Sequence, residues 1–170
     1  MKISTHISHN QSLKAKTLLA FAFAAMLPFG AAQASGGLKV TATNATWQTE
    51  CSTCHVAYPA SLLSAESWKA VMNGLDKHFG TDASVDAAAK KEITAFLEKN
   101  ASQRRRDAVL NANGKPQLRI TETAWFIREH DEVSGRIWKN PLVKSAANCA
   151  ACHTLAEKGD FNEHNIKMPK

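Results

Sequence analysis

The chain has 170 residues, of which 44% are hydrophobic and 7% aromatic, with 21 basic and 15 acidic side chains. This length allows one ordinary domain or two very small ones. The formal net charge is +6, and it falls to +3 (18 basic minus 15 acidic) without the three lysines of residues 1–34, which is too mild to indicate binding to nucleic acid.

Residues 1–34 have the pattern of a secretory signal peptide. Three lysines and no acidic residue precede an apolar block at residues 17–32, and an Ala-Gln-Ala cleavage site ends at Ala34. An uncleaved membrane anchor is the alternative, but this block contains Pro28 and is shorter than the roughly 20 residues that span a bilayer. We therefore expect export to the periplasm and removal of residues 1–34.

All four cysteines lie in two copies of the pattern Cys-x-x-Cys-His. Residues 51–55 read CSTCH, and residues 149–153 read CAACH. In covalent haem attachment the two thiols bond the vinyl groups of the porphyrin, and the histidine becomes the proximal ligand of the iron. The pattern predicts two covalently bound haem c groups, attached at Cys51, Cys54, Cys149 and Cys152 and with proximal ligands His55 and His153.

Disulfides and zinc are the competing interpretations of these cysteines. An exported protein can form disulfides, but pairing within Cys-x-x-Cys closes a tiny loop and constrains little of the unfolded chain. A four-cysteine zinc site normally has about 15–20 residues between its two pairs, far fewer than here. Both interpretations leave the two histidines unexplained.

Residues 35–103 are predicted to form the N-terminal haem domain. Ser64 and Ser67 indicate the start of a helix, which Gly80 can end in a left-handed conformation. His78 falls on the same side of this helix as the apolar stripe of Trp68, Val71 and Leu75. A second helix is predicted from about Ser84, and we expect it to pack across the N-terminal helix that carries Cys51 and Cys54.

A polar connection at residues 104–117 is predicted to separate the two haem domains. It begins with Arg104-Arg105-Arg106-Asp107, which we interpret as a solvated turn or helix end, with a docking patch for an acidic partner as the alternative. The C-terminal haem domain is predicted at residues 118–170. Its expected elements are a short extended piece near 118–120, a helix from about Thr121 with Phe126, His130 and Val133 on one face, a helix after His153 that stops at Gly159, and an irregular tail.

Each iron also needs a second axial ligand or an open position. Outside residues 1–34 and the two motifs, the candidates are His78, His130, His164, Met72 and Met168. We predict His78 for the first iron, with Met72 as the alternative, and His130 for the second iron. For the second iron His164, Met168 and an open site remain alternatives.

Two long stretches of the chain resemble the small dihaem cytochrome c family of proteobacteria, which includes the dihaem donors to the oxygen-binding sphaeroides haem protein. They read WQTECSTCHVAYPASLLSAESWKAVMNGLDKHFGTDAS and RITETAWFIREHDEV…CAACHTLAEKGDF. The resemblance covers nearly all of the mature chain, is weakest at residues 104–117, and includes Trp-x3-Cys, His-Phe-Gly and Arg-Glu-His. It implies a mostly α fold with an N-terminal domain similar to class I cytochrome c and a less regular C-terminal domain. It also implies bis-histidine ligation, with His55 paired to His78 and His153 to His130.

The expected function is one-electron transfer between redox proteins, without enzymatic turnover, because no catalytic constellation apart from the haems is found in the sequence. The resemblance implies a membrane b-type cytochrome as donor and a monohaem high-spin cytochrome c as acceptor. The alternative is a dihaem enzyme or ligand-binding protein, peroxidase-like or binding a gas such as nitric oxide at one exchangeable position. A structural metal-binding or assembly module is a third class.

Overall fold

The structure, a computed structural model, describes residues 38, 40–104 and 110–170. The predicted signal peptide and Arg105-Arg106-Asp107 lie outside these residues. The described part of the chain is helical and contains no β-strand, only isolated bridges, which confirms the mostly α fold class. None of its helices is both long and apolar enough to cross a membrane.

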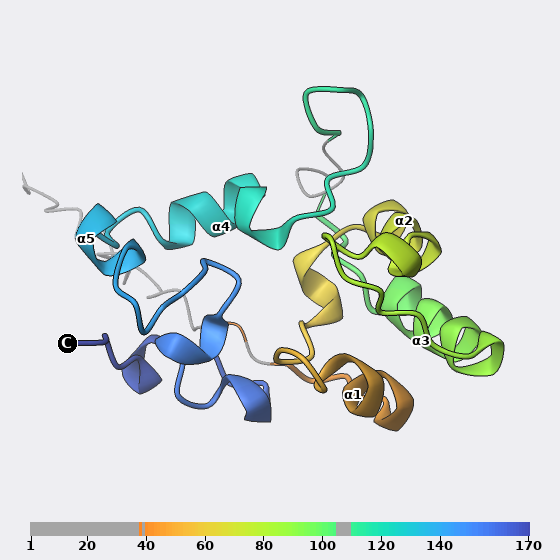
Figure 1. The fold of residues 1–170 in the computed structure, drawn as a ribbon, viewed down its shortest axis with the longest axis horizontal. Coiled ribbons are helices and arrows are strands. Elements are labelled where there is room, and N and C mark those ends of the chain that lie inside the picture. The colour runs from red at the N-terminus through yellow and green to blue at the C-terminus, as the bar shows by residue number, and fades with distance from the viewer. Residues whose placement is uncertain (1–37, 39, 105–109) are drawn as a thin grey trace, which may run out of the picture. The chain divides into compact units, whose positions relative to one another are not determined.

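Three helices form the N-terminal core (Figure 1). They are α1 (Ala45–Cys51), α2 (Ala65–Asn73) and α3 (Ala87–Lys99). Helix α3 packs against both α1 and α2, and the rings of Trp47 and Phe96 lie 5.1 Å apart. This confirms that the helix after residue 84 packs across the N-terminal helix. The buried core includes Trp47, Leu63, Trp68, Val71, Met72, Ile93 and Leu97.

Local capping decides where these helices begin. The side chain of Ser64 accepts a hydrogen bond from the Ser67 amide, which confirms the predicted start of α2. Helix α3 begins three residues later than predicted, because the Asp86 carboxylate caps it by accepting from the amides of Ala88 and Ala89. Helix α1 ends at Cys51, so the prediction that it also carries Cys54 was wrong, and Cys54 lies in the following turn.

The prediction of one helix through residues 64–80 was also wrong. Helix α2 ends at Asn73, and Gly74 leads into a 3-10 turn at Leu75–Lys77. Glycine is a weak helix former, and here its amide bonds the Val71 carbonyl in a tightened last turn. His78 follows that turn, and the next two residues have positive φ angles of 51° and 98°. A compact turn, and not helical periodicity, therefore positions His78.

The C-terminal part consists of short elements. Helix α4 (Ala124–Glu129) is capped by the Thr123 hydroxyl at its start and by His130 at its end, and α5 spans Gly135–Trp138. The helix was predicted to extend from Phe126 as far as Val133, so α4 is shorter than predicted. A 3-10 turn occupies Cys149–Ala151. Another 3-10 turn, Ala156–Lys158, replaces the helix predicted after His153.

Gly159, where the sequence predicted the element to stop, ends that 3-10 turn in a left-handed conformation, with φ of 70°. Its carbonyl accepts a hydrogen bond of 2.9 Å from the amide of Val40, and the Phe161 amide donates one of 3.0 Å to the Leu38 carbonyl. A Cβ atom on Gly159 would lie 2.8 Å from the Cβ atom of Val40. The described start of the chain is thus held close against the C-terminal part.

Residues that follow the predicted linker contact the N-terminal core. Leu118 and Ile120 pack against the core cluster, and a 3-10 turn spans Ile120–Glu122 in place of a strand. The residues before it include an isolated bridge between Leu110 and Pro116. The boundaries at 103, 104–117 and 118 remain predictions.

Candidate functional site

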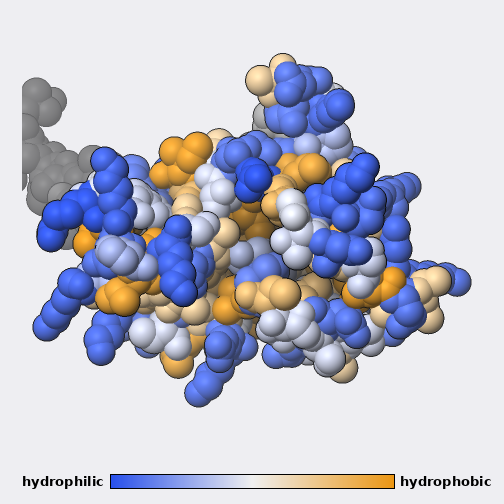
Figure 2. All heavy atoms as spheres, viewed as in Figure 1, coloured by the Kyte–Doolittle hydropathy of each residue, from blue (hydrophilic) through white to orange (hydrophobic). Residues whose placement is uncertain are grey.

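All eight residues predicted to attach or ligate haem line one cavity of about 1170 Å³. This volume exceeds the roughly 300–1,000 Å³ of ordinary small-molecule pockets. Figure 2 shows a hollow in the molecular surface with hydrophobic residues in its floor. The lining residues include Cys51, Cys54, His55, His78, His130, Cys149, Cys152 and His153.

The first histidine pair consists of His55 and His78, both half-buried. Their ring centroids lie 6.3 Å apart, and their planes differ by 26°. The Nδ1 atom of His55 lies 2.7 Å from the backbone carbonyl oxygen of Val56. Because a carbonyl only accepts, Nδ1 carries the proton and Nε2 keeps a lone pair for a metal.

The second pair consists of His130 and His153, whose ring centroids lie 6.1 Å apart with an angle of 74° between the planes. The Nδ1 atom of His130 lies 2.8 Å from the carbonyl oxygen of Phe126, which again leaves Nε2 as the ligating atom. The Nδ1 atom of His153 is buried and has no hydrogen-bond partner. Since buried polar atoms are nearly always paired, this nitrogen requires a partner that the described residues do not supply.

Burial sets the protonation of several of these groups. It lowers the pKa of His78, with His55 as a second cause, and lowers the pKa of His153, with His130 as a second cause. Both shifts favour the neutral imidazole, which is the form that binds a metal. Burial also raises the pKa of Cys51 and of Cys149 to about 11, so these side chains are thiols at neutral pH.

These observations fit two haem c groups. An iron bound by two imidazole nitrogens at about 2 Å each places the ring centroids roughly 6 Å apart, and both histidine pairs have that separation. The four cysteines are unpaired, as thioether attachment requires. When bound, haem supplies an iron that exchanges one electron reversibly.

Two of the three remaining ligand candidates, Met72 and Met168, also line the cavity, whereas His164 does not. Met72 is 4% exposed within the N-terminal core, although it also lines the cavity. Met168 lines the cavity and is 43% exposed. His164 is exposed, in a 3-10 turn at Glu163–Asn165. Among the described residues, His130 has a ring contact with His153. Neither His164 nor Met168 has a comparable ring or hydrogen-bond contact with His153.

An aromatic ring lies against each of the four histidines, a feature that the sequence analysis did not identify except for Phe126. Three of these rings, Tyr58, Phe79 and Phe126, lie within four positions of their histidine in the sequence. That spacing could have predicted these three contacts. The centroid distances are 4.4 Å for Tyr58 and His55, 4.8 Å for Phe79 and His78, 4.0 Å for Phe126 and His130, and 5.4 Å for Phe161 and His153.

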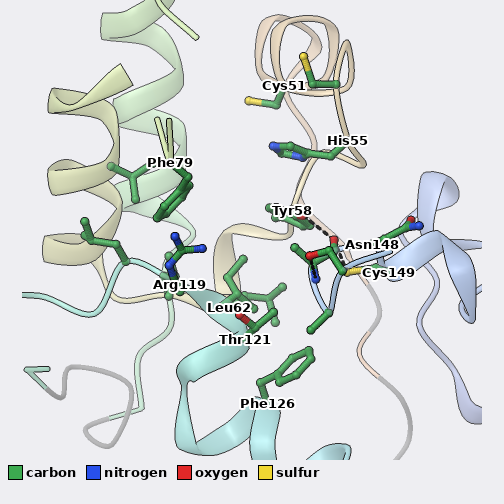
Figure 3. Close-up of a pocket in the computed structure, with 18 of the residues that line it drawn as sticks. Cys51, His55, Tyr58, Leu62, Phe79, Arg119, Thr121, Phe126, Asn148 and Cys149 are labelled. Atoms are coloured by element: carbon green, nitrogen blue, oxygen red, sulfur yellow. Dashed lines mark hydrogen bonds between the residues drawn. The ribbon is translucent and has the colours of Figure 1, made fainter. Parts of the chain in front are cut away.

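Arg119 and Tyr58 connect parts of the site that are distant in sequence (Figure 3). The guanidinium of Arg119 lies 4.3 Å from the centroid of the Phe79 ring, a cation–π distance. The hydroxyl of Tyr58 donates a hydrogen bond to the carbonyl of Ala147. Burial, and then the neighbouring Cys149, raises the pKa of Tyr58 to about 12.

A helical chain with two Cys-x-x-Cys-His segments and a histidine opposite each of them defines the class of small c-type cytochromes. The family model for dihaem cytochrome c matches residues 47–161. The chain belongs to the dihaem cytochrome c family, and it accordingly binds two haem c groups. Membership of this family supports a role in electron transfer by haem.

Solved structures agree with this assignment. The chain is similar to a dihaem cytochrome c from Rhodobacter sphaeroides, with 46% identity, 72% of this chain and 99% of that chain covered, and a TM-score of 0.63. It is also similar to a dihaem cytochrome c from Shewanella baltica OS155, with 42% identity, 74% and 93% covered, and a TM-score of 0.63. The search of curated proteins finds no match.

Proposed function

We propose that the chain is a periplasmic one-electron carrier in which both irons have two histidine ligands. The ligand pairs are His55 with His78 and His153 with His130. The observation that carries this proposal is the separation of the ring centroids, 6.3 Å and 6.1 Å, which suits one iron between each pair.

Filled axial positions favour electron transfer over turnover. An iron with two imidazole ligands has no open position for substrate, and its ligands rearrange little between the ferric and ferrous states. Histidine in place of methionine also lowers the reduction potential. We therefore expect two low potentials, separated by differences in burial and local charge.

The proposed partners are other redox proteins in the same compartment. We propose a membrane b-type cytochrome as the electron donor and a monohaem high-spin cytochrome c as the acceptor. The predicted signal peptide supports export, and N-terminal sequencing of the mature protein should begin at Ser35.

The test is a redox titration combined with addition of carbon monoxide to the reduced protein. We expect two one-electron waves and no change in the absorption spectrum with carbon monoxide. The variants His78→Ala and His130→Ala should each bind one equivalent of carbon monoxide, which makes them matched positive controls. Carbon monoxide binding by the unaltered protein would contradict the proposal and would favour the enzyme or ligand-binding alternative.

A further inference from the structure

The side chain of Tyr58 lies between the two Cys-x-x-Cys-His segments (Figure 3). Its ring stacks on the His55 imidazole, with centroids 4.4 Å apart and planes that differ by 14°. Its hydroxyl donates a hydrogen bond of 2.6 Å to the carbonyl oxygen of Ala147, which is 89 positions away in sequence and two before Cys149. One side chain therefore contacts a proposed ligand of the first site and the loop of the second.

The loop before Cys149, residues 141–148, contains a residue in an unfavourable backbone conformation. Lys144 has a φ of 61°, a left-handed conformation that is unfavourable for a residue with a side chain. The other hydrogen bonds of residues 141–148 are local, such as those from the Asn148 side chain to the Val143 carbonyl and from the Ala147 amide to the Ser145 hydroxyl. The bond from Tyr58 attaches this loop to a distant and more rigid part of the chain.

The backbone around Tyr58 provides that rigidity. Pro59 is fully buried, and a residue before proline is restricted to extended conformations. The carbonyl of Ala60 accepts a 2.6 Å hydrogen bond from the buried indole of Trp68. The Tyr58 ring is therefore presented from a fixed segment, and it can hold the His55 ring in one orientation.

We propose that Tyr58 is a positioning residue that couples the two haem-attachment sites: its ring orients His55, and its hydroxyl holds the loop that presents Cys149. The ring part of this inference rests on the proposed ligation by His55. Tyr58 itself gains or loses neither an electron nor a proton in this role.

Two variants of the haem-loaded full chain separate the ring from the hydroxyl. Tyr58→Phe keeps the ring and removes the hydroxyl, so amide hydrogen exchange at residues 147–149 should become roughly fivefold faster. Exchange in α1 and the low-spin EPR signal of the first site should stay unchanged. Tyr58→Leu removes both groups, so the first-site EPR signal should shift as well.

Thr154→Val is the matched control, because the Thr154 hydroxyl also donates to a backbone carbonyl in the C-terminal part, that of Asn165. It should leave exchange at residues 147–149 unchanged. Unchanged exchange there in Tyr58→Phe, or equal acceleration in Thr154→Val, would overturn the role of the hydroxyl. An unshifted first-site signal in Tyr58→Leu would overturn the role of the ring. If the proposed ligation is wrong, the unaltered protein lacks the first-site bis-histidine signal, while the exchange measurement still tests the loop.

Discussion

The two histidine pairs differ in the angle between their ring planes, 26° in the first pair and 74° in the second. We expect this difference to give the two oxidised irons distinct EPR signals. Each imidazole plane splits the two iron d orbitals of π symmetry, and the effects of two rings add when the planes are parallel and cancel when they are perpendicular. The splitting then scales as the cosine of the angle, about 0.9 of its maximum at 26° and about 0.3 at 74°.

The threefold difference in splitting allows each signal to be assigned by a single substitution. His78→Ala should remove the rhombic low-spin signal that a large splitting produces. His130→Ala should remove the other signal, which is nearly axial and has the larger maximum g value. In each variant one of the two irons should become high-spin, because it loses one of its two proposed axial nitrogens.

The assay is low-temperature EPR of the fully oxidised protein, with spins quantified against haem content. The control is His164→Ala, which should retain both low-spin signals because His164 is exposed. Loss of the rhombic signal in His130→Ala would refute the reasoning from the ring planes. Loss of the same signal in both variants, or of neither, would refute the ligand pairs.

Two further perturbations test other parts of the structure. Trp68→Phe removes the indole donor to the Ala60 carbonyl and should lower the free energy of unfolding by about 1–3 kcal/mol. The measurement is guanidinium unfolding followed by circular dichroism, and an unchanged midpoint would contradict this prediction. Gly159→Ala places a Cβ atom 2.8 Å from that of Val40, so hydrogen exchange of the Val40 amide should be faster in the variant. Equal exchange rates in the variant and the unaltered protein would count against a close approach between residues 40 and 159.

The proposed ligand His78 illustrates what sequence periodicity can and cannot provide. Periodicity placed His78 on the inner side of a helix, and the structure has it facing the cavity from a turn. The prediction of the helix failed at Gly74, where the chain tightens and changes direction. The expected inward orientation nevertheless agrees with the structure, because the apolar residues of α2 define the same interior for the turn that follows.

Contacts between distant segments had no signal in the sequence. The bond between Tyr58 and Ala147 joins residues 89 positions apart, and the pairing of Leu38 with Phe161 joins opposite ends of the described chain. Periodicity and capping rules describe neighbours within one element, so they cannot predict such contacts. The attachment motifs needed no such information, because covalent haem binding places all of its residues within five positions.

The uneven distribution of buried side chains has a consequence for maturation. Residues 40–104 contain eleven buried apolar side chains, whereas residues 118–170 contain three, Phe126, Val143 and Ala156. A chain segment with so small a core gains much of its stability from a bound group, since binding to the folded state alone stabilises it. We therefore expect the first attachment site to lie on a scaffold that can form early, and the second to acquire its structure together with its cofactor. Of these two described parts of the chain, the second should be the more accessible to proteases until its haem is bound.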